Sequence, residues 1–128
     1  MRVLLDTNAF LWAASQPSRL SGPARAAIEE SANQRFLSPV TPWELGIKLN
    51  SGKLHLVGDL PAFIAKHLHE MLLTELPIRM EHAIATTALP PIHRDPFDRM
   101  LVAQAIVERV PIVTSDSHLA RYGVEVIW

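Results

Sequence analysis

The chain has 128 residues, a 48% hydrophobic content and a formal net charge of −1, which suit one domain over residues 1–128. The absence of cysteine excludes disulfides and thiolate metal sites, and the balanced charge does not by itself indicate a nucleic-acid-binding protein. No apolar run approaches the roughly 20 residues of a membrane span, and the N-terminal run is too short for a signal peptide. We therefore expect a cytoplasmic protein without membrane contact.

Short apolar runs alternate along the chain with segments that carry helix signals. Strands are expected over residues 2–6, 35–38, 75–78, 112–115 and 124–128. Helices are expected over residues 7–14, 21–33, 41–51, 61–74 and 81–88, from 96 to before 111, and as a short turn over 117–121. Because strands that alternate with helices form βαβ units, the sequence predicts an α/β fold with a central, mainly parallel five-stranded sheet flanked by helices.

Three of the expected helices begin with a recognisable cap. Thr7 follows the first apolar run and is expected to cap the helix after it. The run Thr41-Pro42-Trp43-Glu44 has the order of a capping box, with proline at the first helical position and an acid three residues after the cap. The run Asp95-Pro96-Phe97-Asp98 repeats this order, so Asp95 is expected to cap the helix that follows.

Four acidic residues stand where strands end or helices begin. Asp6 and Asp116 follow the first and fourth strands, and Glu44 and Asp98 lie in the first turns of two helices. In a parallel sheet covered by helices, strand carboxyl ends and helix N-termini share one edge, so these acids are expected to meet there. Four carboxylates that meet repel one another unless a cation binds them. Oxygen ligands, with no histidine at ligand spacing, predict Mg²⁺ or Mn²⁺ and phosphodiester hydrolysis.

Most of these acids also have a purely structural interpretation. Glu44 is explained equally well by the capping box, and Lys48 by an ion pair with it four residues on. Asp98 suits the positive end of its helix dipole, and Asp116 suits an ordinary turn. Asp6 is the exception, because a carboxylate that ends an apolar strand is costly unless something binds it.

Other polar residues near these positions are weaker candidates for holding the metal ligands, the metal waters or substrate phosphates. Asp95 is foremost a helix cap, and the basic residues near it are by default a solvated patch. A zinc pair at His67 and His69 is not expected, because residues two apart on a helix lie on different faces. The remaining candidates are Thr7, Asn8, Arg94, Arg99 and Thr114, with His93 beside them.

Several short motifs together resemble one known family, the PIN-domain ribonucleases, and in particular the VapC toxins of bacterial and archaeal toxin–antitoxin pairs. They occur in the family's order over the whole chain, and the segment 93–99 departs from the commonest toxin pattern by an extra acid and a proline. The matching pieces are Leu4-Leu5-Asp6-Thr7-Asn8, Glu44 at a helix start, Asp98-Arg99-Met100-Leu101-Val102-Ala103-Gln104-Ala105 and Ile112-Val113-Thr114-Ser115-Asp116.

The resemblance implies a three-layer, PIN-like α/β fold and a Mg²⁺- or Mn²⁺-dependent endoribonuclease. It also implies a homodimer and inhibition by a small antitoxin encoded alongside. Asp6, Glu44, Asp98 and Asp116 match the family's acids, whereas Asn8 and Thr114 match polar neighbours of the metal. The hypothesis is therefore an RNA-cleaving toxin, in which either Asp116 or Asp6 acts as the base. The alternatives are a phosphatase or DNA nuclease that uses the same acids, and a non-catalytic RNA-binding module.

Overall fold

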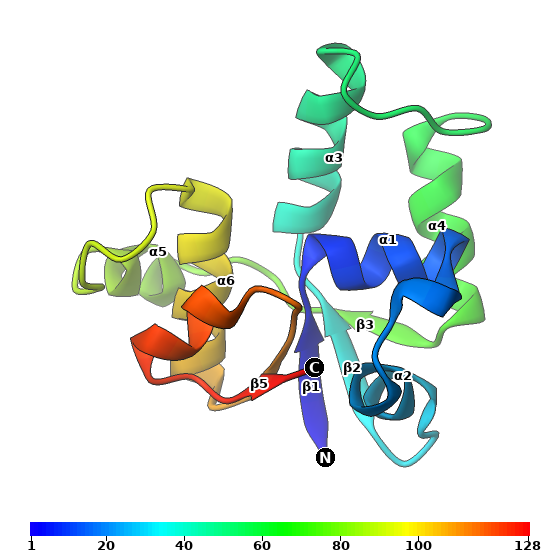
Figure 1. Cartoon of the computed structure of the whole chain (residues 1–128). Coiled ribbons are helices and arrows are strands. Elements are labelled where there is room, and N and C mark those ends of the chain that lie inside the picture. Colours follow the sequence, from blue (N-terminus) through cyan, green and yellow to red (C-terminus); the bar gives the residue numbers. More distant parts are fainter.

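The computed structural model describes all 128 residues, and its centre is one five-stranded sheet (Figure 1). The strands stand in the order β3-β2-β1-β4-β5, and every neighbouring pair is parallel. This confirms the predicted α/β class and the predicted parallel sheet. The strands are β1 (Arg2–Leu5), β2 (Gln34–Leu37), β3 (Leu73–Glu75), β4 (Ile112–Val113) and β5 (Val126–Ile127).

Helices cover both faces of this sheet, so the fold has three layers. Figure 1 shows α1, α2 and α4 on one side of the strands and α5 and α6 on the other. None of these helices is long and apolar enough to cross a membrane. The helices are α1 (Thr7–Ser15), α2 (Gly22–Glu29), α3 (Val40–Asn50), α4 (Leu60–Glu70), α5 (Met80–Thr86) and α6 (Pro96–Glu108), with 3-10 turns η1 (Pro17–Arg19) and η2 (Ser117–Tyr122).

Two apolar cores lie on the two faces of the sheet, because successive strand residues point to opposite sides. On β1, Val3 and Leu5 pack into the core that contains Phe10 of α1. Leu4, between them, packs into the other core with Leu101 of α6. All five side chains are fully buried. Because β1 is buried on both faces, its residues Val3 to Leu5 form an uninterrupted apolar run.

The third strand lies two residues earlier than the sequence predicts. The predicted helix to residue 74 ends at Glu70, and the predicted strand over 75–78 is instead Leu73–Glu75. The chain turns at Leu72, which takes the left-handed conformation with φ 51°. Glycine usually occupies such a position, so the leucine there gave no sign that the helix ends.

Candidate metal centre

The acidic residues gather where the order of the strands changes direction. The chain builds β1, β2 and β3 outward to one side and then returns to place β4 on the other side of β1. Asp6 directly follows β1, and Asp116 lies three residues after the end of β4. In open α/β sheets the crevice at such a switch point, outside the carboxyl ends of the strands, is the usual place for a ligand.

Asp6 is the most buried of the four acids and has a structural task as well. Its Oδ1 accepts a 2.7 Å hydrogen bond from the Ala9 N–H, so Asp6 caps α1 and the predicted cap, Thr7, is instead the first helical residue. Burial raises the pKa of Asp6 to about 6, against the lowering effects of the Thr114 hydroxyl and the Ala9 N–H. The charge of Glu44 adds to the rise. A carboxylate this costly to ionise favours a nearby cation.

Glu44 is held from both sides, and neither contact is a helix cap. The Thr7 hydroxyl donates to its Oε1 over 2.9 Å, and Lys48 Nζ lies 2.9 Å from its Oε2, which confirms the predicted ion pair. The predicted capping box is wrong, because α3 begins at Val40 and Thr41 lies inside the helix. The Thr41 hydroxyl lies 3.2 Å from the Thr7 hydroxyl. Glu44 therefore points toward α1 rather than toward its own helix start.

Asp98 lies in the first turn of α6, where the predicted cap is confirmed. Asp95 Oδ1 accepts a 2.8 Å hydrogen bond from the Phe97 N–H. The pKa of Asp98 is raised to about 7, first by burial and then by the charges of Asp95, Glu44 and Asp6, against a lowering effect of His93. The charges of acids from other elements, Glu44 of α3 and Asp6 before α1, thus act on Asp98.

Asp116 completes the group and differs from the others in its electrostatics. Its Oδ1 accepts from the His118 N–H over 2.9 Å, and its backbone N–H donates to the Thr114 hydroxyl over 3.0 Å. Desolvation raises its pKa, but the His93 ring and the His118 N–H outweigh that effect and lower the pKa below its usual value. Thr114, which also contacts Asp6, therefore links the two acids that follow β1 and β4.

His93 is a member of the cluster that the prediction of an oxygen-only site missed. Its Nε2 lies 2.9 Å from Asp116 Oδ2. One ligand atom from each of His93, Asp98 and Asp116 lies within 4.8 Å of the other two. The three residues come from the loop before α6, from α6 and from the turn after β4, so no short sequence spacing reveals them. The sequence placed His93 beside Asp98 only as a candidate for contact with substrate phosphates.

The remaining predicted candidates are Arg99, which has a structural role, and Arg94 and Asn8, which do not contact the acids. Arg99 donates to the backbone carbonyls of Thr86 and Pro90, over 3.1 and 2.9 Å, so it pins the loop after α5 and is not directed at a substrate. Arg94 and Asn8 are exposed, and neither side chain hydrogen-bonds to the acids.

The two histidines of α4 lie in different environments. His67 is buried against Phe63, with ring centroids 4.5 Å apart, whereas His69 is exposed. The pKa of His67 is lowered by its burial. Its ring packs edge-on against Phe10 and Phe63 in the apolar core of that face.

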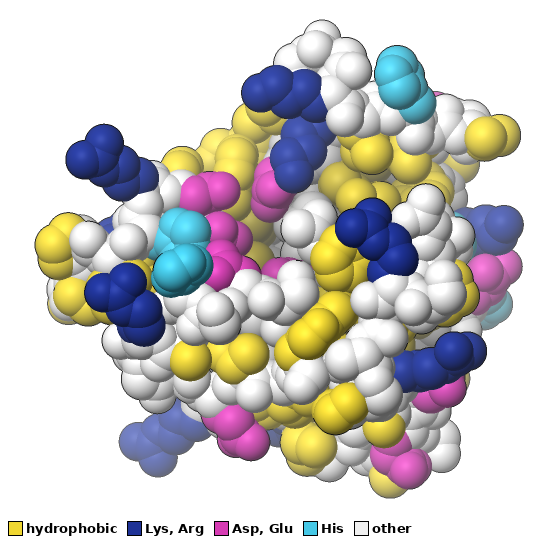
Figure 2. Space-filling view, in the orientation of Figure 1, with side chains coloured by type: hydrophobic (Ala, Val, Ile, Leu, Met, Phe, Trp, Pro, Cys, Tyr) yellow, Lys and Arg dark blue, Asp and Glu magenta, His cyan; other side chains and the backbone are white.

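The donor set suits a divalent cation. Figure 2 shows Asp and Glu side chains gathered in a hollow beside a histidine, with lysine and arginine around the opening. Raised pKa values at Asp6 and Asp98 mean that the ionised cluster is destabilised as it stands. A cation with a preference for carboxylate oxygen relieves that repulsion, and Mg²⁺ and Mn²⁺ have this preference.

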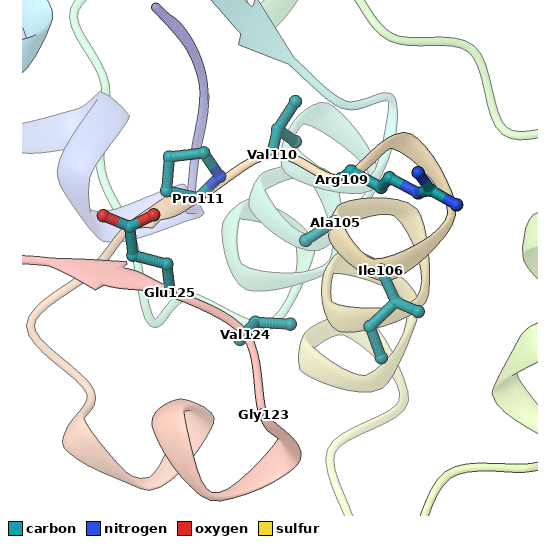
Figure 3. Close-up of a pocket in the computed structure, with 8 residues that line it drawn as sticks. All are labelled: Ala105, Ile106, Arg109, Val110, Pro111, Gly123, Val124 and Glu125. Carbon is teal, nitrogen blue, oxygen red and sulfur yellow. The ribbon is translucent and has the colours of Figure 1, made fainter.

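A separate hollow of about 280 Å³ lies at the opposite edge of the sheet (Figure 3). Residues 109–111 and 123–125, which precede β4 and β5, line it together with Ala105 and Ile106 of α6. Its charged members are Arg109 and Glu125. It contains none of the four acids.

The match of the chain to known proteins agrees with this geometry. Residues 3–125 match the model of the PIN domain. The chain belongs to the PIN-domain family. This confirms the resemblance that the motifs around Asp6, Asp98 and Asp116 indicate. No curated protein matches the chain in sequence.

Several solved structures have the same fold. VapBC2 of Rickettsia felis, bound to a promoter DNA fragment, has a TM-score of 0.74 at 15% identity, covering 98% of this chain and 97% of that one. DNA-bound VapBC of Salmonella typhimurium has a TM-score of 0.69 at 18% identity, covering 98% and 96%. FitAcB of Neisseria gonorrhoeae has a TM-score of 0.64 at 22% identity, covering 97% and 95%. At these identities the likeness concerns the fold.

Proposed function

We propose that this PIN-domain protein is a Mg²⁺- or Mn²⁺-dependent endoribonuclease and the VapC-like toxin of a toxin–antitoxin pair. The observation that carries the proposal is the convergence of Asp6, Glu44, Asp98 and Asp116 at the switch point of the sheet, where two of them have raised pKa values. PIN-domain family membership agrees with nuclease chemistry at such a cluster.

In this proposal Asp6, Asp98 and Asp116 hold the cation, and Glu44 is the fourth acid of the cluster. When bound, the ion supplies a water of lowered pKa and neutralises charge that develops on the phosphate. Thr7 and Lys48 keep the carboxylate of Glu44 in place. Thr114 orients the turn that carries Asp116. Asp6 and Asp116 flank the crevice from adjacent strands and are the two candidates for accepting the proton of the attacking water.

The partner is proposed to be a small antitoxin protein that blocks this edge. Support comes from the solved structures of similar fold, which are described as VapBC and FitAB assemblies. A homodimer and a cytoplasmic location are part of the same proposal, since an RNA-cleaving toxin meets its substrate there. Solution mass with and without a co-expressed antitoxin tests the assembly.

The function is tested by offering the purified protein single-stranded RNA, DNA of the same sequence and a small phosphate ester in the presence of Mn²⁺. The proposal expects internal cleavage of RNA and no turnover of the ester. Cleavage of DNA or of the ester that is faster than cleavage of RNA would contradict the proposal and identify a DNA nuclease or a phosphatase. Binding of RNA without cleavage replaces it with a non-catalytic module.

The role as a toxin is tested separately by expression in a bacterial host. Growth is expected to stop on expression of the chain and to continue on expression of Asp6→Asn. Continued growth in both cases, with RNA cleavage intact in vitro, removes the toxin role and leaves the nuclease.

A further inference from the structure

His93 is the one histidine whose ring contacts an acid of this cluster. Its Nε2 stands 2.9 Å from Asp116 Oδ2, and one ligand atom from each of His93, Asp98 and Asp116 lies within 4.8 Å of the other two. About a quarter of its side chain is exposed, 26%, so the cluster opens to solvent beside this ring. An ion arriving from solution therefore meets the imidazole together with the two carboxylates.

We propose that His93 Nε2 is a ligand of the divalent ion, together with Asp98 and Asp116. The centre then has one nitrogen ligand among its carboxylates and prefers a first-row transition ion such as Mn²⁺ over Mg²⁺. This inference rests on the metal-dependent function proposed above and adds to it a ligand and a metal preference.

The spacing of the donor atoms fits two ligands of one ion. Adjacent ligands of an octahedral ion with bonds of about 2.1 Å lie about 3 Å apart. The 2.9 Å between His93 Nε2 and Asp116 Oδ2 matches that separation. The same separation also fits a hydrogen bond from Nε2–H to the carboxylate. Nε2 can bind a metal only when its proton lies on Nδ1, so the position of the ring proton distinguishes a metal ligand from a hydrogen-bond donor.

A second histidine of the chain, His82, has hydrogen-bond partners at both ring nitrogens. His82 Nε2 is also 2.9 Å from a carboxylate, that of Glu108. Its Nδ1, however, accepts the Arg79 N–H over 2.9 Å, so a neutral ring must carry its proton on Nε2. His82 is fully buried and cannot offer Nε2 to a metal without breaking that bond. Its cluster with Glu81 and Glu108 is therefore structural.

His93 differs from His82 because its Nδ1 has no hydrogen-bond partner. Its Nδ1 makes no hydrogen bond within the chain, so a proton can reside there, toward solvent, and leave the Nε2 lone pair for a metal. The backbone of His93 is nevertheless fixed, because its N–H donates to the Tyr122 hydroxyl over 2.7 Å and its carbonyl accepts from Arg99 over 3.4 Å. The ring is thus held at the cluster by backbone contacts, as a preorganised ligand requires.

The nitrogen ligand determines the metal preference. Imidazole adds affinity for first-row transition ions, whereas Mg²⁺ favours oxygen ligands alone. We expect the affinity ratio of Mn²⁺ to Mg²⁺ to be at least about tenfold higher in the natural chain than in His93→Gln. Glutamine can still offer an oxygen, so the variant keeps a metal site and loses the nitrogen.

The test is Mn²⁺ binding followed by electron paramagnetic resonance, with Mn²⁺ alone as the probe. Pulsed spectra of the Mn²⁺-loaded protein are expected to contain a ¹⁴N coupling from imidazole. The coupling should disappear in His93→Gln and persist in His118→Gln, the matched control. The ring of His118 lies 6.0 Å from that of His93, is exposed, and supplies no atom to the cluster.

The outcomes separate this inference from the proposed function. Mn²⁺ that binds without a ¹⁴N coupling, or with one that His93→Gln retains, overturns His93 as a ligand and leaves the carboxylate centre standing. Failure of the natural chain to bind Mn²⁺ overturns both. An unchanged Mn²⁺-to-Mg²⁺ ratio in His93→Gln, measured by calorimetry on a variant with a native circular dichroism spectrum, also overturns the preference.

Discussion

The hydroxyl of Thr7 donates a 2.9 Å hydrogen bond to Oε1 of Glu44, which joins the first residue of α1 to the second turn of α3. Both partners are largely withdrawn from water, since Thr7 is buried and only 13% of the Glu44 side chain is exposed. The bond fixes which way the carboxylate faces. Thr7 therefore acts on the acidic cluster by positioning Glu44.

Removal of this hydroxyl is expected to slow RNA cleavage without unfolding the protein. Thr7→Val keeps the volume of the side chain but leaves Glu44 with Lys48 as its one fixed partner. We expect a fall in cleavage rate of about tenfold, the lower end of the usual cost of losing a partner of a metal-site ligand. Thr7→Ser, which keeps the hydroxyl, is the control. Equal rates in the two variants contradict the positioning role.

Arg99 and Arg94 are expected to differ in their effect on stability. Arg99 donates to the carbonyls of Thr86, Leu89, Pro90 and His93 and is their only common partner. Arg99→Ala is expected to lower the free energy of unfolding by about 2–4 kcal/mol, because charge-assisted hydrogen bonds to partly buried carbonyls are lost. Arg94→Ala is expected to change it by less than about 0.5 kcal/mol. Urea unfolding measures both, and similar losses would refute the difference.

The metal-free protein is expected to lose stability as the pH rises through the pKa of Asp98. Folding raises that pKa from an ordinary value of 3.8 to about 7, so the folded state binds more protons than the unfolded chain between those values. The free energy of unfolding therefore falls from about pH 4 to pH 7 and then levels off. In chelator, Asp98→Asn is expected to melt higher than the natural chain at pH 8 and equally at pH 4.

Asp116→Asn is the control of opposite sign in the same melting experiment. Folding lowers the pKa of Asp116, so its charge contributes stability above its unfolded pKa, and that stability is lost as the pH falls through the folded value. This variant is expected to melt lower than the natural chain at neutral pH. Melting curves of the two variants that shift in the same direction at pH 8 disprove the electrostatic description of the cluster.

Divalent metal is expected to stabilise the folded chain through the same acids. At a Mn²⁺ concentration about one hundred times the dissociation constant, binding to the folded state alone contributes about 2.7 kcal/mol. The melting temperature of the natural chain should rise by several degrees, whereas Asp98→Asn should show little change. NaCl at equal ionic strength controls for screening, and an equal rise in both proteins locates the binding elsewhere.

The sequence predicted the strand-terminal acids better than the helix starts near them. Asp6 and Asp116 were found because an apolar run that ends in a carboxylate has one simple interpretation in a parallel sheet. The cap at Thr7 was wrong because the polar run from Asp6 to Asn8 offers more than one cap, and the cap at Thr41 was wrong because the helix begins earlier, at Val40. Asp6 and Pro39 took those positions, and both threonine hydroxyls turned toward each other.

The contact of His93 with Asp116 and the exact bounds of the third strand were not predicted, for different reasons. His93 meets Asp116 across 23 residues of chain, through loop conformations that no local spacing encodes. The third strand was displaced because Leu72 adopts a backbone conformation that its side chain disfavours. Arg99, predicted by default to lie in a solvated basic patch with a phosphate contact as the alternative, instead donates to the carbonyls of the loop after α5, which depends on the path of that loop.

Cleavage of RNA by Asp6→Asn tests the central proposal most directly, because asparagine preserves the cap of α1 and removes the carboxylate charge. Purified natural chain and variant receive a labelled single-stranded RNA with Mn²⁺, with excess chelator, and with Mn²⁺ restored. We expect internal cleavage by the natural chain that chelator abolishes and Mn²⁺ restores, and a rate at least about one hundredfold lower in the variant. Cleavage that persists in chelator, or at an equal rate in Asp6→Asn of native circular dichroism, would contradict a metal-dependent carboxylate centre.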